Sequence, residues 1–436
     1  MNIRQELKTR FDQAELLQVK ENNFKITVEN WDIQDLVHND LEKAALRVIS
    51  EGRSGSNSCF GDSEETLIDL LEGAEESSRY GDPALFDYSQ EKLQQFEAGE
   101  EEKYQQTPPA MMLDFLEEVK GFMAGAGREM TLNISLQKEY LEEKIETTRD
   151  GDLQENKTSF SLMVSVPVPG GGSQLGRLFV QPDFFSQVPE QELQNLIFEQ
   201  ERSREVSLPE TGQLPVIFSP RSLYFLMISL IEGISAANIY RETSPLLGRL
   251  GEKIFSERLS ITDRPRMEAA GSRRSFDDEG IPTREQSIVR RGELQNYIYD
   301  LEYAARLEEE PKGNGLKRTL FSDSIDTPVS PVLINPVIEP GNSSREQMVE
   351  GLQEGIMVEN IVGFHSSNYQ QGHFSVQAHG FHIQAGEIKG RLENVMIAGN
   401  IYQDFQQVAA AGRILYPGYY GYYPYLLVEG IQVTGR

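Results

Sequence analysis

The chain has 436 residues and a formal net charge of −28, from 41 basic and 69 acidic side chains. This length suggests two domains rather than one core, and the acidic balance argues against nucleic acid or an anionic membrane as a partner. The single cysteine, Cys59, excludes a disulfide framework or a cysteine-rich zinc site within the chain and is typical of a reducing compartment.

Targeting and membrane signals are the next things the sequence can exclude. The first 24 residues carry charges throughout, which is unlike the apolar region of a signal peptide. The most apolar stretch, Leu223 to Ile234, is far shorter than the roughly 20 residues that a membrane span needs. We therefore expect a cytoplasmic protein.

The first 130 residues alternate between helical and strand patterns. Apolar spacing predicts an amphipathic helix over residues 1–20, and alternation predicts a strand over 24–28. Small residues at 51–57 indicate a turn. Two further helices are expected, one starting near Ser63, which can cap it, and one over 114–123.

The next segment is rich in strand patterns. We expect strands at 132–136, 140–147 and 159–168, followed by a glycine-rich loop at 169–173. This loop lacks the Gly-Lys-Ser/Thr ending of a phosphate-binding loop, so a nucleotide site is not expected there. A helix over 187–203 closes this half of the chain.

Residues 207–213, with Pro209 and Gly212, are the best candidate for a domain boundary. The sequence thus predicts an N-terminal α+β domain at 1–206 and a C-terminal, strand-rich domain at 214–436. The overall class is α+β, with an α/β-type layer first and then a barrel-like or sandwich domain that contains one long buried helix.

That helix has a clear start signal in the second half. Ser219 can cap it, Pro220 suits its first position, and apolar residues recur at helical spacing as far as Ile234. A hairpin with Gly292 in its turn is expected over 288–298, a long loop over 308–331 and a helix over 343–355. Strands and turns follow from Ile361 to Val433.

Four of the five histidines fall close together, at His365, His373, His379 and His382. Such clustering raises the hypothesis of a metal site, but no acidic residue lies between them. Exposed or hydrogen-bonded histidines are the more ordinary interpretation, and no metal ligand is assigned.

Two other groups of residues allow a functional and a structural interpretation. Asp277, Asp278 and Glu279 could form an acid/base pair, but a turn in which they accept hydrogen bonds from the backbone beside Gly280 is favoured. The tyrosine-rich run 416–425 could grip an extended peptide, although covering a sheet or an interface is the more common role. No G-x-S-x-G pattern supports serine-based catalysis.

An ordered series of segments resembles the TldD/PmbA family, which is described both as peptide-processing metallopeptidases and as modulators of DNA gyrase. The series spans residues 214–436, and the match is weaker in the first half, where it rests on the turn at Gly52-Arg53. The segments are Val216 to Pro220, Glu232 to Arg241, Leu246 to Ile254, Leu259 to Asp263, Ser275 to Thr283, Tyr303 to Arg306, His365 to Asn368 with Gly372, Phe374 and Ser375, and Ile397 to Asn400.

The resemblance implies a two-domain α+β fold and a cavity enclosed between paired subunits. Zinc-bearing members carry H-E-x-x-x-H on the long helix and a later cysteine as a third ligand. The corresponding positions here are Ile228, Ser229 and Gly233, and no cysteine follows Cys59. No catalytic residue and no cofactor of its own are therefore expected for this chain, and zinc is expected in a TldD-like partner.

This pattern resembles the PmbA-like, or TldE-like, type of subunit, which completes a peptidase that acts on unfolded or leader peptides. His365, Ser366, Asn368, Phe374 and Ser375 are the candidates for the substrate cavity. Two alternatives stay open: an independent hydrolase that uses the histidines from His365 to His382, and a non-enzymatic peptide-binding or assembly protein. A TldD-like subunit is the expected partner, a homodimer in isolation is plausible, and neither DNA nor a membrane is expected.

Overall fold

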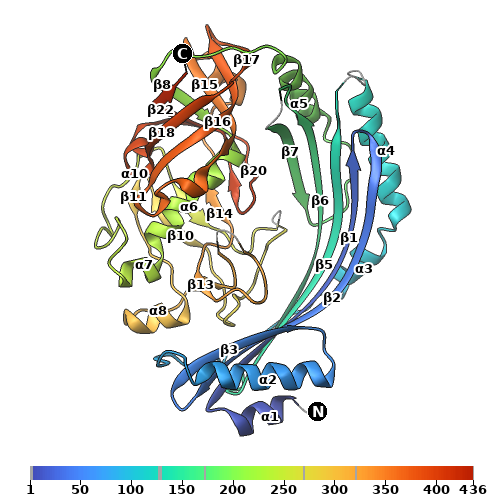
Figure 1. Ribbon diagram of the computed structural model, residues 1–436, viewed down its shortest axis with the longest axis vertical. Helices are drawn as coiled ribbons and strands as arrows, with labels where there is room; N and C mark the ends of the chain where they lie inside the picture. Colours follow the sequence, from blue (N-terminus) through green and yellow to red (C-terminus); the bar gives the residue numbers. More distant parts are fainter. Residues whose placement is uncertain (1–2, 126–129, 171–172, 269–270, 320–321, 436) are drawn as a thin grey trace.

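The computed structural model of the protein describes residues 3–125, 130–170, 173–268, 271–319 and 322–435. Within these residues the fold is a mixed α+β arrangement of a large curved sheet and a compact strand-rich part (Figure 1). This agrees with the α+β class that the sequence predicts. Gly171 and Gly172 of the predicted glycine-rich loop lie outside the described residues.

The curved sheet contains seven of the described strands in the order β3-β2-β1-β5-β6-β4, with β7 beside β6. All but the short β4, which pairs in parallel with β6, pair in antiparallel fashion. Its strands are β1 (Gln13–Glu29), β2 (Asp32–Ser50), β3 (Arg53–Phe60), β4 (Lys92–Gln95), β5 (Asn133–Thr147), β6 (Asp152–Pro167) and β7 (Gln174–Gln181).

Helices cover the convex face of this sheet and its lower end in Figure 1. Met112, Phe115 and Leu116 of α4 pack against the buried side chains of β1, β5 and β6. The helices of this half are α1 (Ile3–Arg10), α2 (Glu64–Ser78), α3 (Ala98–Gln105), α4 (Pro109–Ala124) and α5 (Glu190–Arg202). The opposite, concave face turns toward the strand-rich part, so that face is the one available for a site.

Five of the described strands close into a barrel in the second half, because β15 pairs with both β8 and β16. Their order is β15 (Glu354–Val362), β8 (Gly212–Phe218), β22 (Leu426–Thr434), β18 (Val395–Asn400) and β16 (His373–Gln384). Strands β17 (Glu387–Arg391) and β19 (Val408–Ala411) extend it. This confirms the barrel-like form of the expected strand-rich domain.

A second, smaller sheet packs beside the barrel in the order β11-β10-β9-β14-β21-β20. Its strands are β11 (Glu293–Leu294), β10 (Gln286–Arg290), β9 (Ile261–Asp263), β14 (Pro336–Ile338), β21 (Tyr422–Tyr423) and β20 (Tyr416–Pro417). A two-stranded ribbon adds β12 (Gly315–Leu316) and β13 (Ser330–Pro331). The remaining elements are α6 (Pro220–Ile234), α7 (Ala236–Tyr240), α8 (Leu301–Arg306), α9 (Arg345–Glu350), α10 (Ile401–Asp404), η1 (Phe364–Ser366), η2 (Tyr369–Gln371) and η3 (Phe405–Gln407).

Helix α6 is the long buried helix that the sequence predicts. The hydroxyl of Ser219 accepts a hydrogen bond from the Ser222 amide, and Pro220 occupies the first turn. Leu223, Leu226 and Leu230 are fully buried in the main core cluster. The helix therefore sits at the centre of the strand-rich part, with its positions fixed by packing on several sides.

Five predicted elements are wrong in their extent. The helix predicted over 1–20 ends at Arg10, and residues 13–20 belong to β1. The turn predicted over 51–57 is confined to Glu51 and Gly52, both with positive φ, and β3 begins at Arg53. The two strands predicted at 132–136 and 140–147 are one strand, β5.

The helix predicted over 343–355 is the fifth. It is reduced to α9, and β15 already begins at Glu354. Gly351 follows the helix directly, and the chain then enters the barrel. The predicted division of the chain into domains at 206 and 214 stays a prediction. One core cluster combines α4 and α5 with Ile217, Met357 and Phe381 of the barrel, so the two halves share part of their core.

Candidate functional site

The three positions that the resemblance aligns with a zinc motif, Ile228, Ser229 and Gly233, lie on α6 and face different surroundings. Ile228 lines a cavity, whereas Ser229 and Gly233 face the core. The Tyr402 hydroxyl donates to the Ser229 carbonyl at 2.8 Å. A Cβ atom on Gly233 would lie 2.2 Å from that hydroxyl, so Tyr402 fills the space that a side chain at this position would need.

This arrangement does not fit a zinc ion. Isoleucine and glycine offer no side-chain ligand, and serine is not among the usual protein ligands of zinc. Among the residues that the structure describes, no group of three or more His, Cys, Asp or Glu side chains is arranged to hold a metal. No step of any reaction is therefore assigned to a metal in this chain.

The clustered histidines do not converge in space. His365 and His373 are exposed, His379 is partly buried and His382 is 4% exposed. His382 holds Ser207 through Nδ1 and Glu354 through Nε2, both at 2.8 Å. The Ser207 amide donates to the Arg391 carbonyl, so it is not free to stabilise an oxyanion. The hydrogen bonds among Ser207, His382 and Glu354 hold the segment after α5 on the barrel.

The five predicted substrate-cavity residues lie on η1, at the start of η2 and at the start of β16. His365, Ser366, Asn368 and Ser375 are exposed, while Phe374 belongs to the main core. Phe364 of η1 and Tyr369 of η2 stack on one another, and Phe364 also packs against Phe225 of α6. None of the five lines the cavity beside the tyrosine-rich run or the cavity beside α6 and α7, and their role stays a prediction.

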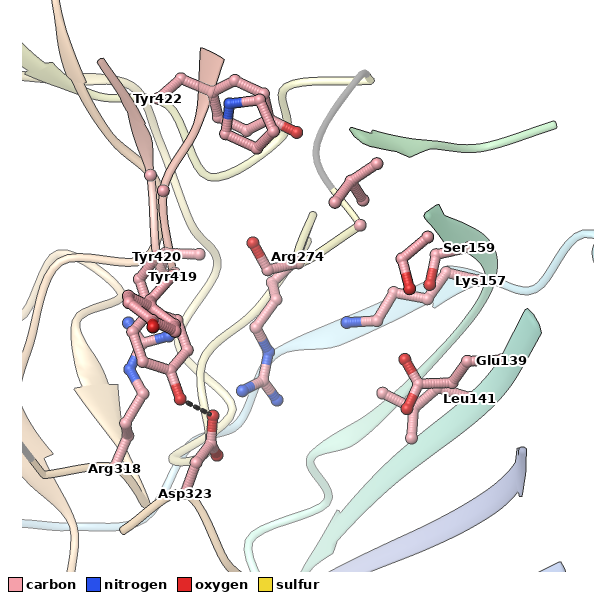
Figure 2. Close-up of a pocket in the computed structure, with 18 of the residues that line it drawn as sticks. Glu139, Leu141, Lys157, Ser159, Arg274, Arg318, Asp323, Tyr419, Tyr420 and Tyr422 are labelled. Atoms are coloured by element: carbon pink, nitrogen blue, oxygen red, sulfur yellow. Dashed lines mark hydrogen bonds between the residues drawn. The ribbon is translucent and has the colours of Figure 1, made fainter. Parts of the chain in front are cut away.

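The first cavity, of about 360 Å³, lies between the concave face of the curved sheet and the tyrosine-rich loop (Figure 2). The sheet contributes side chains from β5, β6 and β7, and the other wall comes from the loops of the strand-rich part. The lining residues labelled in Figure 2 are Glu139, Leu141, Lys157, Ser159, Arg274, Arg318, Asp323, Tyr419, Tyr420 and Tyr422.

Hydrogen bonds and ring stacking fix the tyrosine wall of this cavity. The Tyr420 hydroxyl donates to Asp323 Oδ2 at 2.9 Å, and the Arg318 guanidinium lies 4.0 Å from the centre of the Tyr420 ring. Burial raises the pKa of Tyr420, and the Asp323 carboxylate raises it further. Tyr420 is therefore a hydrogen-bond donor and an aromatic surface, and it does not act as a base.

The second cavity, of about 220 Å³, lies between α6, α7 and the segment around β13. Its lining is mostly apolar, with Ile228 and Ile231 on α6 and Val332 and Leu333 opposite. Arg318 and Tyr420 line both cavities, so the two sites share one wall. Sequence analysis missed Arg318, because it falls in a stretch that reads as a polar loop.

The aspartate-rich turn has the structural role that the sequence favours. Asp277 accepts hydrogen bonds from the amides of Glu279, Ile281 and Gly315, and Asp278 accepts one from Lys317. Burial, and then the Glu279 charge, raise the pKa of Asp277 well above its ordinary range. Burial opposes ionisation of Asp278 as well, but Arg274 and the Lys317 amide outweigh it and lower the Asp278 pKa.

This turn also connects the two halves of the molecule through buried charges. Arg47 of β2 donates to Glu279 Oε1 at 2.7 Å and lies 3.4 Å from Glu15 of β1. Arg274 bridges Asp278 to Glu143 of β5. The concave sheet face and the loops of the strand-rich part are thus held in register, which sets the width of the first cavity.

The tyrosine-rich run is mainly internal to the chain. Tyr422, Tyr423 and Tyr425 are buried, and Tyr419 is 57% exposed. This agrees with the interpretation that the run covers a sheet, since its strands β20 and β21 belong to the smaller sheet.

Comparison with known proteins agrees with this architecture. The profile of the PmbA/TldA metallopeptidase C-terminal domain matches residues 211–435, and the chain belongs to the PmbA/TldD family. It is 30% identical over 195 residues to a zinc metalloprotease TldD homolog of Saccharolobus solfataricus, covering 44% of this chain and 42% of that protein. Metalloprotease PmbA of Escherichia coli O157:H7 is 28% identical over 203 residues, or 47% and 42% of the two chains.

A solved structure matches over the whole length. The crystal structure of TldE from Thermococcus kodakarensis superposes with a TM-score of 0.88 at 20% identity, covering 100% of this chain and 99% of the other. At this identity the likeness shows the fold. By sequence, the chain spans about half the length of the curated relatives it matches. No helix within the described residues has the length and apolar character needed to cross a membrane.

Proposed function

We propose that this chain is the zinc-free, TldE-like subunit of a two-subunit metallopeptidase that trims unfolded or leader peptides in the cytoplasm. The observation that carries the proposal is the state of α6, where Ile228, Ser229 and Gly233 stand at the zinc-motif positions and Tyr402 closes the space beside Gly233. The family's metal chemistry must then come from a partner that carries H-E-x-x-x-H.

The chain's own contribution is a wall of the peptide cavity. A polar concave sheet face and a tyrosine wall enclose the first cavity, and an apolar pocket adjoins it. Closing a cavity over a metal-bound water excludes bulk solvent and strengthens the electrostatic interactions inside it. A partner less acidic than this chain is preferred, since two chains of charge −28 repel one another.

The first test is metal content. Chelator-free protein, produced alone, is expected to contain well under one zinc ion per chain, because the α6 positions offer no ligand set. Elemental analysis of the purified chain measures this. About one tightly held transition metal per chain would contradict the assignment and revive the histidine hypothesis.

The second test is activity with and without a partner. The chain alone is expected not to cleave a casein-like unfolded substrate, while a mixture with a zinc-bearing family member cleaves it and loses that activity on chelation. Co-purification from the native cells identifies the partner to use. Chelator-insensitive cleavage by this chain alone would rule out the proposed division of roles.

A further inference from the structure

The second cavity contains a buried arginine, Arg318, that forms no ion pair with a carboxylate of the described residues. Arg318 is 7% exposed, donates to the Leu333 carbonyl and stacks on Tyr420. Among the residues that the structure describes, no ion pair joins its guanidinium to an acidic side chain. A buried guanidinium carries five N–H donors and a desolvation cost that an anion can offset.

The acidic groups around Arg318 are already engaged by other donors. Glu232, in the same lining, accepts from the Asn238 side chain. Asp323 accepts from the Tyr420 hydroxyl. Asp263 accepts from the amides of Ile334 and Asn335 and from the Asn314 side chain. The Arg318 charge acts on the buried Asp263 carboxylate, but none of these carboxylates accepts a hydrogen bond from the guanidinium, so its remaining N–H groups are available to a ligand.

The rest of the cavity restricts what that ligand can be. Its apolar lining comes from Tyr224, Ile228, Ile231, Pro331, Val332, Leu333 and Pro336. Its volume of about 220 Å³ is below the range of typical drug-sized sites and suits one side chain. The charged residues of the lining are Arg241, Arg318 and Glu232, which gives one net positive charge in a strongly acidic chain.

We propose that this Arg318 pocket, the cavity defined by Arg318, Ile228, Ile231, Ala237 and Val332, binds the C-terminal residue of a peptide. The free carboxylate pairs with Arg318, for which planar guanidinium geometry is well suited, and an apolar side chain fills the lining between α6 and β13. The preceding residues of the peptide run past Tyr420 into the first cavity, because Arg318 and Tyr420 line both. This inference rests on the proposed function, from which it takes the peptide.

The test compares three probes by isothermal titration calorimetry on the full chain: the peptide N-acetyl-Gly-Gly-Gly-Leu as free acid, the same peptide as its C-terminal amide, and N-acetyl-leucine. The acid is expected to bind at least ~10-fold more tightly than the amide, which is the usual size of a hydrogen bond to a charged group. N-acetyl-leucine should bind more weakly than the peptide acid. Equal binding of acid and amide overturns the assignment of Arg318 as a carboxylate-binding residue. Equal binding of N-acetyl-leucine and the peptide acid overturns the assignment of the ligand as a peptide.

Two variants and a control locate the site. Arg318→Gln should weaken the acid at least ~10-fold and abolish the preference over the amide. Ala237→Leu adds bulk to the pocket lining while the arginine itself is kept, and it should weaken both peptides, so the proposal stays testable if Arg318→Gln does not fold. Arg258→Gln, at an exposed arginine that donates to the Ala409 carbonyl, should change nothing.

The outcomes separate this inference from the proposed function. If the acid does not bind but the chain still co-purifies with a zinc-bearing subunit that cleaves peptides, the pocket assignment is wrong and the proposed function stands. If the acid binds and no such partner is found, the pocket is real and the two-subunit function is wrong. Unchanged acid binding in Ala237→Leu, with the variant folded, would also overturn the pocket.

Discussion

Replacing Glu279 by alanine is expected to lower the free energy of unfolding by about 3–5 kcal/mol, the usual cost of removing one partner from a buried ion pair. Glu279 is 1% exposed and accepts from Arg47 through Oε1 and from the Leu301 amide through Oε2, both at 2.7 Å. Without it, Arg47 keeps Glu15 at 3.4 Å, and the first amide of α8 loses its acceptor. Urea denaturation at pH 7 measures the change.

Two comparisons make this result specific. Glu285→Ala, at an exposed carboxylate 3.9 Å from Arg264, should change stability by less than about 0.5 kcal/mol. Glu279→Gln keeps an oxygen acceptor and should cost less than the alanine variant. A loss of under about 1 kcal/mol for Glu279→Ala would show that Arg47 and Leu301 find other partners, and that this connection between the two halves is weak.

Elements with strong local signals were predictable from the sequence. Helix α6 follows Ser219 and Pro220, α2 follows its Ser63 cap, and the hairpin turns at Arg291 and Gly292. In each case the residues that start or stop the element act within a few positions along the chain. Sequence reasoning is most successful for such signals, because they do not depend on distant contacts.

The strands of the curved sheet were harder to predict from the sequence, because their two faces are buried by different parts of the molecule. In β5, Leu136 and Tyr140 are buried at even positions, whereas Glu143 and Ile145 are buried at odd positions. In β1, Leu16 packs with α1 and α2 while Leu17 packs against Phe276. The change of buried face along one strand breaks the period of two that identifies a strand.

The candidate site was predictable only in part. The resemblance identified α6 and the stretch that supplies Glu232, Asn238 and Arg241 to the second cavity. Arg318 carried no such signal, since it lies in a polar segment, and its burial arises from packing against Tyr420, about a hundred residues further along the chain. A residue whose role depends on a long-range contact of this kind needs the structure.

The pKa of Asp300 also depends on residues that are distant in the sequence. It makes the stability of the folded protein depend on pH in a way that can be measured. It caps α8 by accepting from the Tyr303 amide at 2.8 Å. Burial, and then the Glu279 carboxylate, raise its pKa to about 8. In the unfolded chain it titrates near 4, so between about pH 4 and pH 8 the folded protein holds a proton that the unfolded chain releases.

Asp300→Asn is therefore expected to stabilise the protein at alkaline pH. The contribution of Asp300 to stability is fully present below about pH 4 and is lost as pH rises toward 8, because the unfolded state binds fewer protons in that window. Asparagine keeps the cap oxygen and cannot ionise, so the variant should match the wild type near pH 4.5 and exceed it at pH 9 by on the order of a few kcal/mol. Denaturation curves at pH 4.5, 7 and 9 measure this, with Asp69→Asn, at an exposed position of α2, as the matched control. A constant difference between variant and wild type across this range would mean that Asp300 is ionised in the folded protein and that Glu279 does not disfavour its charge.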